Sequence, residues 1–351
     1  MATLSAEYHS MVLRALGLQN LYAYGPEEMS AIKERLMLIW NQMKRYNHAP
    51  DIRDYNHLLG FAGRASDWQL CQQVWFELDE ASSNTSLFGL SPNVYSYNAY
   101  MQAAIQCKQA PRAVNMFNTM LSNDVQPNSF SYNTLMEAYG HMGDLQEVDG
   151  LFGRHFSSAV SDKPTTGRLS SLLHPQRDAS TALGRQVATL SRYTTSQPST
   201  QLAPSVDTFL AMIDAHGRQG KLERMHEIYQ DLMPEYNIKP TLAIFNGMIR
   251  WYCDKSEIET ARQLFFEMER QGVQPNVVTF NYIFRHEALK RNRPGVAERL
   301  VDLMHNVYNQ PPLQSMYRHL IKIHNRHNRD HEVDRLVRSY EQSMASHSDK
   351  H

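Results

Sequence analysis

The chain has 351 residues, of which 42% are apolar and 20% are charged, and its formal net charge at pH 7 is -1. No apolar run approaches the roughly 20 residues that a membrane-spanning helix needs. The three cysteines, Cys71, Cys107 and Cys253, are widely spaced. We therefore expect buried thiols in a reducing compartment, with neither a disulfide framework nor a metal site.

The charge is distributed unevenly along the chain. Residues 1–163 carry 11 basic and 16 acidic side chains, whereas residues 242–351 carry 16 basic and 13 acidic ones. The basic C-terminal third weakly favours contact with a nucleic acid, and an ordinary solvated surface is the alternative interpretation.

Residues 1–51 have the least regular pattern. Leu36, Trp40 and Met43 follow a helical spacing, so residues 31–51 are predicted to be the second helix of a partial repeat, preceded by degenerate helices. The N-terminus has few basic residues and an early Glu7, which makes it a poor organellar presequence. We expect a chain that lacks its leader or begins at a processed or truncated end.

An aromatic residue followed directly by asparagine recurs downstream. The pairs are Tyr55-Asn56, Tyr97-Asn98, Tyr132-Asn133, Phe245-Asn246 and Phe280-Asn281. Successive pairs are 42, 35, 113 and 35 residues apart. A motif that recurs at such a period indicates a repeat architecture.

The unit from residue 94 to residue 128 shows what a repeat contains. Tyr97, Tyr100 and Met101, at its fourth, seventh and eighth positions, share one face of an amphipathic helix. A second apolar series follows the break near Pro111, and Asn128 closes the unit. Each unit is therefore predicted to be a helix-turn-helix hairpin that buries its faces only against its neighbours.

The same frame fits seven units, which begin at residues 52, 94, 129, 206, 242, 277 and 314. Three units occupy residues 52–165 and four occupy residues 206–348, the last of them degenerate. The fourth position is aromatic in every unit, and we expect its ring in the core. Residues 166–205 are rich in Ser and Thr without a helical period. They are predicted to be a mostly disordered insertion, with a short helix at 179–190 as the alternative.

These units resemble the pentatricopeptide repeat, in a form similar to the P class of that family. The closest match has Ala261, Phe265 and Met268 in a second helix and Gly272-Val273-Gln274-Pro275-Asn276 at the end of the unit. The resemblance covers roughly residues 17–348 without the insertion. The tetratricopeptide repeat has a small residue where this chain has Met268, which favours the pentatricopeptide repeat.

The resemblance implies an all-α fold, a right-handed α-solenoid whose first helices line a groove for single-stranded RNA. It also implies that the fifth and last residues of a unit contact one base and that second-position side chains stack on it. The implied base-contacting residues are Asn56, Asn93, Asn98, Asn128, Asn133, Asn246, Asn276 and Asn281. The implied stacking residues are Tyr95, Phe130 and Val278.

The asparagines also have a structural interpretation. Asn93, Asn128, Thr241 and Asn276 directly precede a predicted helix, where Asn and Thr are favourable caps. The fifth-position asparagines lie past the cap, where Asn is a mediocre helix former. Helix stability gives no reason for this choice, whereas an amide can match the edge of a base. We therefore favour base contact over a residue inherited from an ancestral repeat.

In this family, asparagine at the fifth position goes with pyrimidines. The resemblance thus implies that Asn56 with Asn93, Asn98 with Asn128, and Asn246 with Asn276 each select C or U. The unit at 206 has Leu210 and Thr241 at these positions and Asp207 at its second, so it is predicted to contact no base.

No motif of an enzyme, phosphate loop or clustered metal-binding carboxylates is present, so neither catalytic residues nor a cofactor or small-molecule substrate is expected. His324, His327 and His331 have a spacing that zinc could use. They lie at a predicted turn with Arg326 and Arg329 between them, and a solvated turn or a phosphate contact is the preferred interpretation.

The sequence thus predicts a non-catalytic protein that binds pyrimidine-containing single-stranded RNA in the processing, stability or translation of organellar transcripts. Mitochondrial localisation follows from the family resemblance alone, and partners on the mitochondrial ribosome or among RNA-processing proteins are compatible with it. The alternative is a protein-interaction scaffold or ribosome-associated subunit without base readout. A negative first-helix face in residues 52–165 would favour that alternative.

Overall fold

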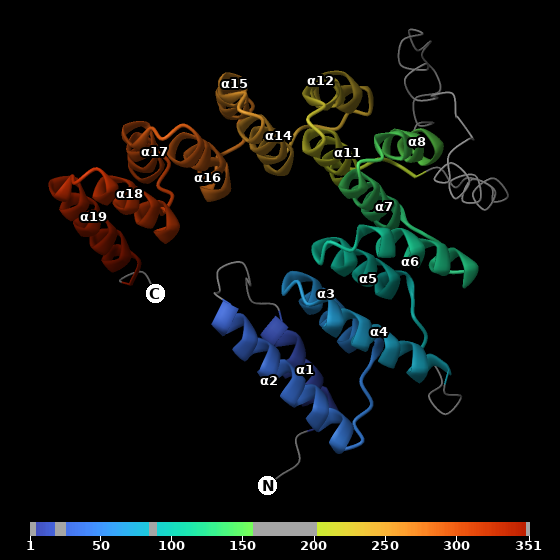
Figure 1. The fold of residues 1–351 in the computed structure, drawn as a ribbon. Coiled ribbons are helices and arrows are strands. Elements are labelled where there is room, and N and C mark those ends of the chain that lie inside the picture. Colours follow the sequence, from blue (N-terminus) through green and yellow to red (C-terminus); the bar gives the residue numbers. More distant parts are fainter. Residues whose placement is uncertain (1–4, 18–25, 84–89, 157–201, 349–351) are drawn as a thin grey trace. The chain divides into compact units, whose positions relative to one another are not determined.

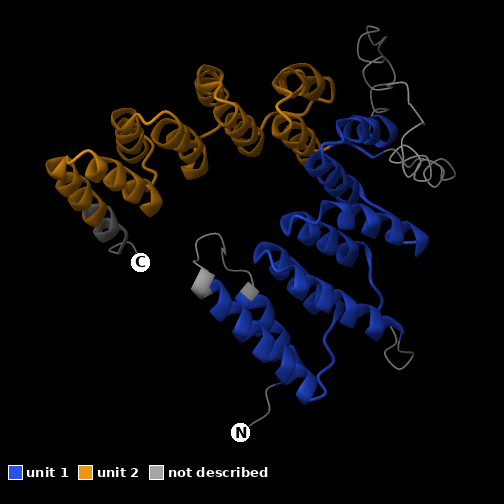
Figure 2. Ribbon diagram, viewed as in Figure 1, with its two compact units in different colours: residues 1–204 blue, residues 205–351 orange. Residues whose placement is uncertain are grey.

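The computed structural model describes residues 5–17, 26–83, 90–156 and 202–348, which are helices and their connections without any β-strand (Figure 1). The chain divides into two compact units, Met1–Pro204 and Ser205–His351 (Figure 2). In the described residues, no helix is long and apolar enough to cross a membrane.

Unit 1 is a stack of helix hairpins. The hairpins are α1 (Ala6–Gly17) with α2 (Pro26–Arg45), α3 (Ile52–Arg64) with α4 (Trp68–Ser83), α5 (Val94–Gln106) with α6 (Ala110–Ser122), and α7 (Ser129–Met142) with α8 (Leu145–His155). The first helices pack side by side, α1 against α3, α3 against α5 and α5 against α7. This arrangement is the all-α stacking that the repeat pattern predicts, and the stacked first helices form one continuous face.

Unit 2 repeats the hairpin design with two π-helical turns. The helices are α11 (Val206–Arg218), α12 (Leu222–Glu227), η3 (Ile228–Leu232), α13 (Met233–Glu235), α14 (Leu242–Asp254), α15 (Ile258–Arg270), α16 (Val277–Arg285), η4 (His286–Lys290), α17 (Pro294–Asn306), α18 (Gln314–Arg326) and α19 (Asp330–Ser348). Again the first helices are neighbours, α11 against α14 and α14 against α16.

Reciprocal caps set where the first helices begin. Asn93 precedes α5 in extended backbone, and its side chain accepts hydrogen bonds from the Tyr95 and Ser96 amides. The Ser96 hydroxyl in turn accepts the Asn93 amide, 3.2 Å away, which completes a capping box. Capping boxes also precede α3, α7, α11 and α16, at Asp51, Asn128, Ser205 and Asn276. The third residue of these helices is fully buried although it is polar, because it serves the cap.

The cap interpretation is wrong for Thr241. This residue precedes α14 but makes no side-chain cap bond, and its buried Oγ1 has no hydrogen-bond partner. The third residue of α14 is Ile244, which has no hydroxyl to receive the cap amide. The polar half of the capping box is therefore missing from this unit.

Fourth-position rings form the core between hairpins. Tyr55, Tyr97, Phe209, Phe245, Phe280 and Tyr317 are all buried. Tyr132 is only half-buried, and its ring instead stacks on His155 with 4.0 Å between centroids. The expectation of a core ring thus holds in six units and is wrong for Tyr132, which lies beside the last helix described before residue 157.

Gly63 allows α3 and α5 to approach closely. A Cβ atom at this position would lie 2.7 Å from the Ala103 Cα and would also collide with Gln106. Any larger side chain would therefore separate two helices that both contribute to the first-helix face, at a cost typical of overpacking, about 1–3 kcal/mol.

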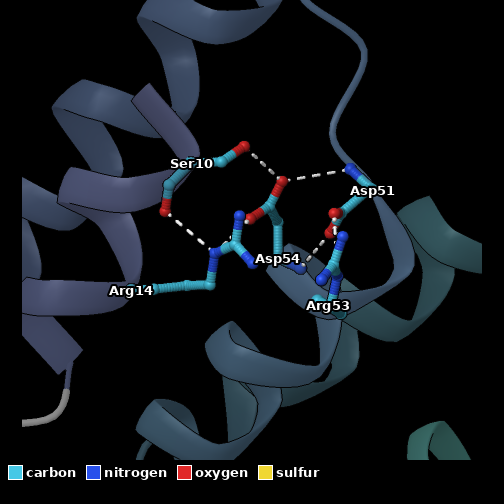
Figure 3. Close-up of polar contacts among 5 residues, drawn as sticks. All are labelled: Ser10, Arg14, Asp51, Arg53 and Asp54. Carbon is cyan, nitrogen blue, oxygen red and sulfur yellow. Dashed lines mark hydrogen bonds and ion pairs between the residues drawn. The ribbon is translucent and has the colours of Figure 1, made fainter. Parts of the chain in front are cut away.

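A buried carboxylate joins the N-terminal hairpin to α3 (Figure 3). Asp54 Oδ2 accepts hydrogen bonds from Ser10 Oγ at 2.7 Å and from the Asp51 amide at 3.0 Å. Asp54 Oδ1 lies 3.3 Å from Arg14 Nε. Residues 1–51 thus include a helix, α1, that is joined to α3 by a hydrogen bond and an ion pair. The predicted second helix in this region begins earlier than expected, at Pro26.

The predicted insertion at 166–205 lies outside the described residues, except for residues 202–205. These four are not helical, and the Leu202 amide donates to the His155 carbonyl oxygen at 3.0 Å. Ser205 is the N-cap of α11.

Two histidines are expected to make stability depend on pH. Burial, with Arg64 and Arg14 nearby, lowers the pKa of His57 to about 4, and burial with Arg154 lowers the pKa of His155 to about 4. Because an unfolded histidine titrates near 6.5, the unfolded chain binds protons that the folded chain does not. This contribution to stability is complete above about pH 6.5 and is lost as pH falls towards about 4.

Urea denaturation at about pH 7.5 and about pH 5 tests this dependence. The His57→Gln, His155→Gln double variant should lose less stability on acidification than the wild type, whereas His331→Gln, at an exposed position, should lose the same. The same loss in the double variant and the wild type would contradict the assignment.

Candidate nucleic-acid interface

The first-helix face has a regular order of side chains. Second-position residues are exposed or half-buried in the seven units: Arg53, Tyr95, Phe130, Asp207, Ala243, Val278 and Ser315. Fifth-position asparagines lie beside them and deeper, with Asn98 and Asn133 buried and Asn56, Asn246 and Asn281 half-buried. Positions 2 and 5 are three residues apart and so share a helix face. Because the fourth-position ring points into the core, the second-position side chain is left towards solvent and the fifth-position side chain lies between them.

In unit 1 this order produces a cavity of about 440 Å³. Its lining includes Asn98 and Asn128, flanked by Tyr95 and Phe130 at successive second positions. The two rings are 69% and 51% exposed, respectively. Four residues that the sequence singled out, from two helices and a cap, therefore meet at one site.

Asn98 and Asn128 are hydrogen-bonded to each other in this cavity. Asn98 Nδ2 donates to Asn128 Oδ1 over 3.4 Å, while the same oxygen accepts the Ser131 amide at 3.0 Å. Asn98 therefore supports the cap of the next first helix, a structural reason for Asn at the fifth position that sequence reasoning missed. Asn98 Oδ1 is buried without a hydrogen-bond partner, so it is an unsatisfied acceptor of a kind that is rare in folded proteins.

Asn246 and Asn276 form the equivalent pair in unit 2, with Nδ2 and Oδ1 3.3 Å apart. Here, however, Thr279 Oγ1 donates to Asn246 Oδ1 at 2.6 Å. The acceptor that is free on Asn98 is thus occupied on Asn246.

The other predicted base-contacting residues are not paired in this way. Asn56 and Asn133 each have a buried Oδ1 without a hydrogen-bond partner, and in the described residues no hydrogen bond joins Asn56 to Asn93. The expected partner of Asn133 falls in residues outside the described ranges. Asn281 precedes a unit whose N-cap is Leu313, which has no amide side chain to offer. Val278, the third predicted stacking residue, is 43% exposed and directly follows the first residue of α16.

The unit at 206 presents different chemistry. Leu210 replaces the fifth-position amide, Thr241 has no cap bond, and Asp207 is exposed at the second position. That this unit contacts no base stays a prediction.

The unit 1 cavity is not acidic. Arg64 is the one charged residue in its lining. Four acidic side chains of unit 1, Glu77, Asp79, Glu147 and Asp149, lie on second helices. The cavity therefore has no acidic side chain in its lining.

The histidines near the C-terminus do not converge. His324 is buried and its Nε2 lies 2.6 Å from Glu298 Oε1, whereas His327 and His331 are exposed. Within the described ranges, no group of three or more His, Cys, Asp or Glu residues could hold a metal ion.

Stacked helix hairpins whose first helices present a repeated set of side chains define a helical-repeat protein of the solenoid class. Family models specify the class further. The model described as PPR repeat family matches residues 92–152 and 240–288, and the model described as pentatricopeptide repeat domain matches residues 199–255. Over these residues the chain matches pentatricopeptide repeats.

Curated proteins with similar sequences are named as pentatricopeptide repeat-containing proteins. A pentatricopeptide repeat-containing protein of Arabidopsis thaliana is 26% identical over 229 residues, 59% of this chain and 36% of the relative. A chloroplastic member from the same plant is 21% identical over 71% of this chain and 31% of the relative. A mitochondrial one is 36% identical over 20% of this chain and 11% of the relative. The chain thus spans about a third of the length of the first two.

Solved structures with similarity to the chain include the maize pentatricopeptide repeat protein PPR10. The match covers 99% of this chain and 60% of that one, with 15% identity and a TM-score of 0.34. PPR10 in complex with an 18-nucleotide psaJ RNA element matches over 98% of this chain and 56% of that one, with 15% identity and a TM-score of 0.36.

Proposed function

We propose that this chain binds single-stranded RNA on its first-helix face and has no catalytic activity of its own. The observation that carries the proposal is the unit 1 cavity, where Asn98 and Asn128 lie between the exposed rings of Tyr95 and Phe130. A flat aromatic base can stack between such rings while an amide contacts its edge. The match of residues 92–152 and 199–288 to pentatricopeptide repeat models supports the same ligand class.

The free Asn98 Oδ1 gives the cavity its hydrogen-bonding character. This oxygen accepts, and the amide nitrogen of Asn98 is already donating to Asn128. The cavity therefore favours a base that presents an N–H group at this point. All four RNA bases carry such a group on their Watson–Crick edge, so this oxygen alone does not select a base, and the pyrimidine preference rests on the family pattern.

The units should contribute unequally. The cavity at Asn98 has a free acceptor, while Thr279 occupies the equivalent oxygen of Asn246. The unit at 206 has no amide at the fifth position. We propose that base contact is concentrated in residues 52–165, that the units from 242 add weaker contacts, and that affinity falls as salt rises.

The chain is proposed to act in an organelle, since relatives include chloroplastic and mitochondrial proteins. Mitochondrial localisation, and a role in the processing, stability or translation of transcripts, belong to the proposal. So do partners on the mitochondrial ribosome or among RNA-processing proteins.

Fluorescence anisotropy with labelled pyrimidine and purine oligomers tests the function. The wild type should prefer the pyrimidine oligomer, and the Asn98→Ala, Asn133→Ala double variant should lose most of that preference. Two hydrogen bonds at about 1 kcal/mol each correspond to a roughly 30-fold weaker binding.

Asn115→Ala is the matched control, because Asn115 is exposed on the second helix α6. Circular dichroism checks that the double variant keeps its helices. If the wild type binds both oligomers equally and the double variant changes nothing, base readout is excluded and the scaffold function stands in its place.

A further inference from the structure

Unit 2 contains a further cleft, the basic cleft, whose lining includes neither Asn246 nor Asn276. It has a volume of about 580 Å³ and is formed by α11, α14, α16 and η4. Its lining includes Arg218, Arg250, Trp251, Tyr282, Arg285 and His286. The cleft combines several cations with flat aromatic surfaces, and no feature of the base-reading pattern requires it.

The arginines of the cleft are held over a fixed aromatic ring. The guanidinium carbon of Arg250 lies 4.5 Å from the centre of the Trp251 ring, and that of Arg218 lies 5.3 Å from it. Trp251 Nε1 donates to Asp214 Oδ1 at 2.6 Å. A Cβ atom on Gly217 would lie 2.9 Å from the Trp251 Cβ, so only glycine leaves room for the ring. The platform is thus built by specific contacts.

Positive charge in the cleft is only partly neutralised. Among the described residues, neither Arg250 nor Arg285 has an ion-pair partner at its guanidinium. The one carboxylate in the lining, Asp254, is paired with Lys290, whose Nζ lies 3.1 Å from its Oδ1. The two arginines occupy the ninth positions of α14 and α16, which are adjacent first helices, and they therefore offer net positive charge to a ligand.

A buried histidine lines the same cleft. His286, in the π-helical turn η4, is 2% exposed and neither ring nitrogen has a hydrogen-bond partner. Burial, the largest cause, lowers the pKa of His286, with Glu287 opposing and Arg291, Lys290 and Arg262 adding to the effect. The neutral ring offers one donor and one acceptor. Buried polar groups without partners are rare in folded proteins and require an explanation such as a ligand.

We propose that the basic cleft binds a phosphate group through Arg250, Arg285 and the ring N–H of His286. Guanidinium groups match the oxygens of phosphate in charge and geometry, and the half-buried Tyr282 offers a surface for an attached base or sugar. The phosphate belongs to an RNA backbone or to a small phosphomonoester. The RNA source rests on the proposed function, whereas the phosphate chemistry does not.

The salt dependence of RNA binding tests the RNA source. For the Arg250→Gln, Arg285→Gln double variant, the slope of log affinity against log salt should become shallower by roughly 0.7 for each RNA phosphate that the variant no longer neutralises. The control is Arg299→Gln with Arg338→Gln, which removes the same charge from exposed sites on α17 and α19. A slope that changes equally in both double variants, or in neither, overturns the RNA source.

NMR of the histidine rings tests the phosphate chemistry directly. Inorganic phosphate, and separately adenosine monophosphate, should shift the His286 resonances at matched ionic strength, whereas chloride should not. The His286→Phe variant, which keeps a ring in the buried space, identifies the signal, and the arginine double variant should lose the response. Unperturbed His286 resonances, together with an unchanged salt slope, would refute the proposal that the cleft binds phosphate.

The two measurements separate the two hypotheses. A wild type that binds no RNA but shows the phosphate response refutes the proposed function and assigns the cleft to a small phosphomonoester. A wild type that binds RNA, with the cleft variants indistinguishable from it in both measurements, keeps the proposed function and refutes the cleft.

Discussion

Replacing Tyr95 and Phe130 together by alanine is expected to weaken binding of a pyrimidine oligomer by roughly 10- to 100-fold. Stacking of one base on aromatic side chains contributes about 1–3 kcal/mol, and a base in the unit 1 cavity would contact both rings. The two side chains are mostly exposed, so replacing them removes little buried apolar surface from the folded protein. The loss should therefore appear in affinity and hardly at all in thermal stability.

Anisotropy with the labelled oligomer measures the effect, and Phe76→Ala is the control. Phe76 is 61% exposed on the second helix α4, so it is an aromatic ring of comparable exposure that lies outside the first-helix face. A similar loss of affinity in the control, or none in the double variant, would remove the cavity as the site of RNA contact.

Replacing Asp54 by alanine is expected to destabilise the N-terminal hairpin by about 2–4 kcal/mol. The change removes the acceptor for Ser10 Oγ and for the Asp51 amide, and it leaves the Arg14 guanidinium without its carboxylate partner. Removing one member of a buried polar pair exposes the cost of leaving the others unsatisfied. Since each hairpin is stabilised only by its neighbours, the effect should remain local.

Amide hydrogen exchange measures that locality. Exchange should accelerate in α1 while α5 and α6 keep their protection, and Asp79→Ala, at an exposed site on α4, should change neither. Uniform acceleration throughout unit 1 would mean that the hairpins unfold together, and an unchanged α1 would show that Asp54 does not anchor it.

The two polar atoms of the Asn98 side chain have different roles. Its Nδ2 supports the next cap, and its buried Oδ1 has no partner. An asparagine in this position is therefore not by itself evidence of base contact. The hydroxyl of the next unit's third residue decides the difference, because Thr279 donates to Asn246 Oδ1 whereas Ser131 donates to Asn128 Oδ1.

The sequence by itself determined the repeat and its register. First helices begin at Ile52, Val94, Ser129, Val206, Leu242, Val277 and Gln314, where the repeat frame places the first residue of each unit. Local chemistry explains this success, because a cap residue, a fourth-position ring and a helical period act within one turn of each other. The outward placement of the second-position side chains follows from the same period.

Only the tertiary structure decided which polar atoms remain available. The partners of Asn98 and Asn246 come from residues 30 and more positions away, and no local pattern specifies whether a hydroxyl reaches one amide or the next. The basic cleft was equally beyond the sequence, since Arg250, Arg285 and His286 meet only when α14 and α16 stack. Hydrogen-bond partnership and charge proximity depend on distances between units, and packing alone sets those distances.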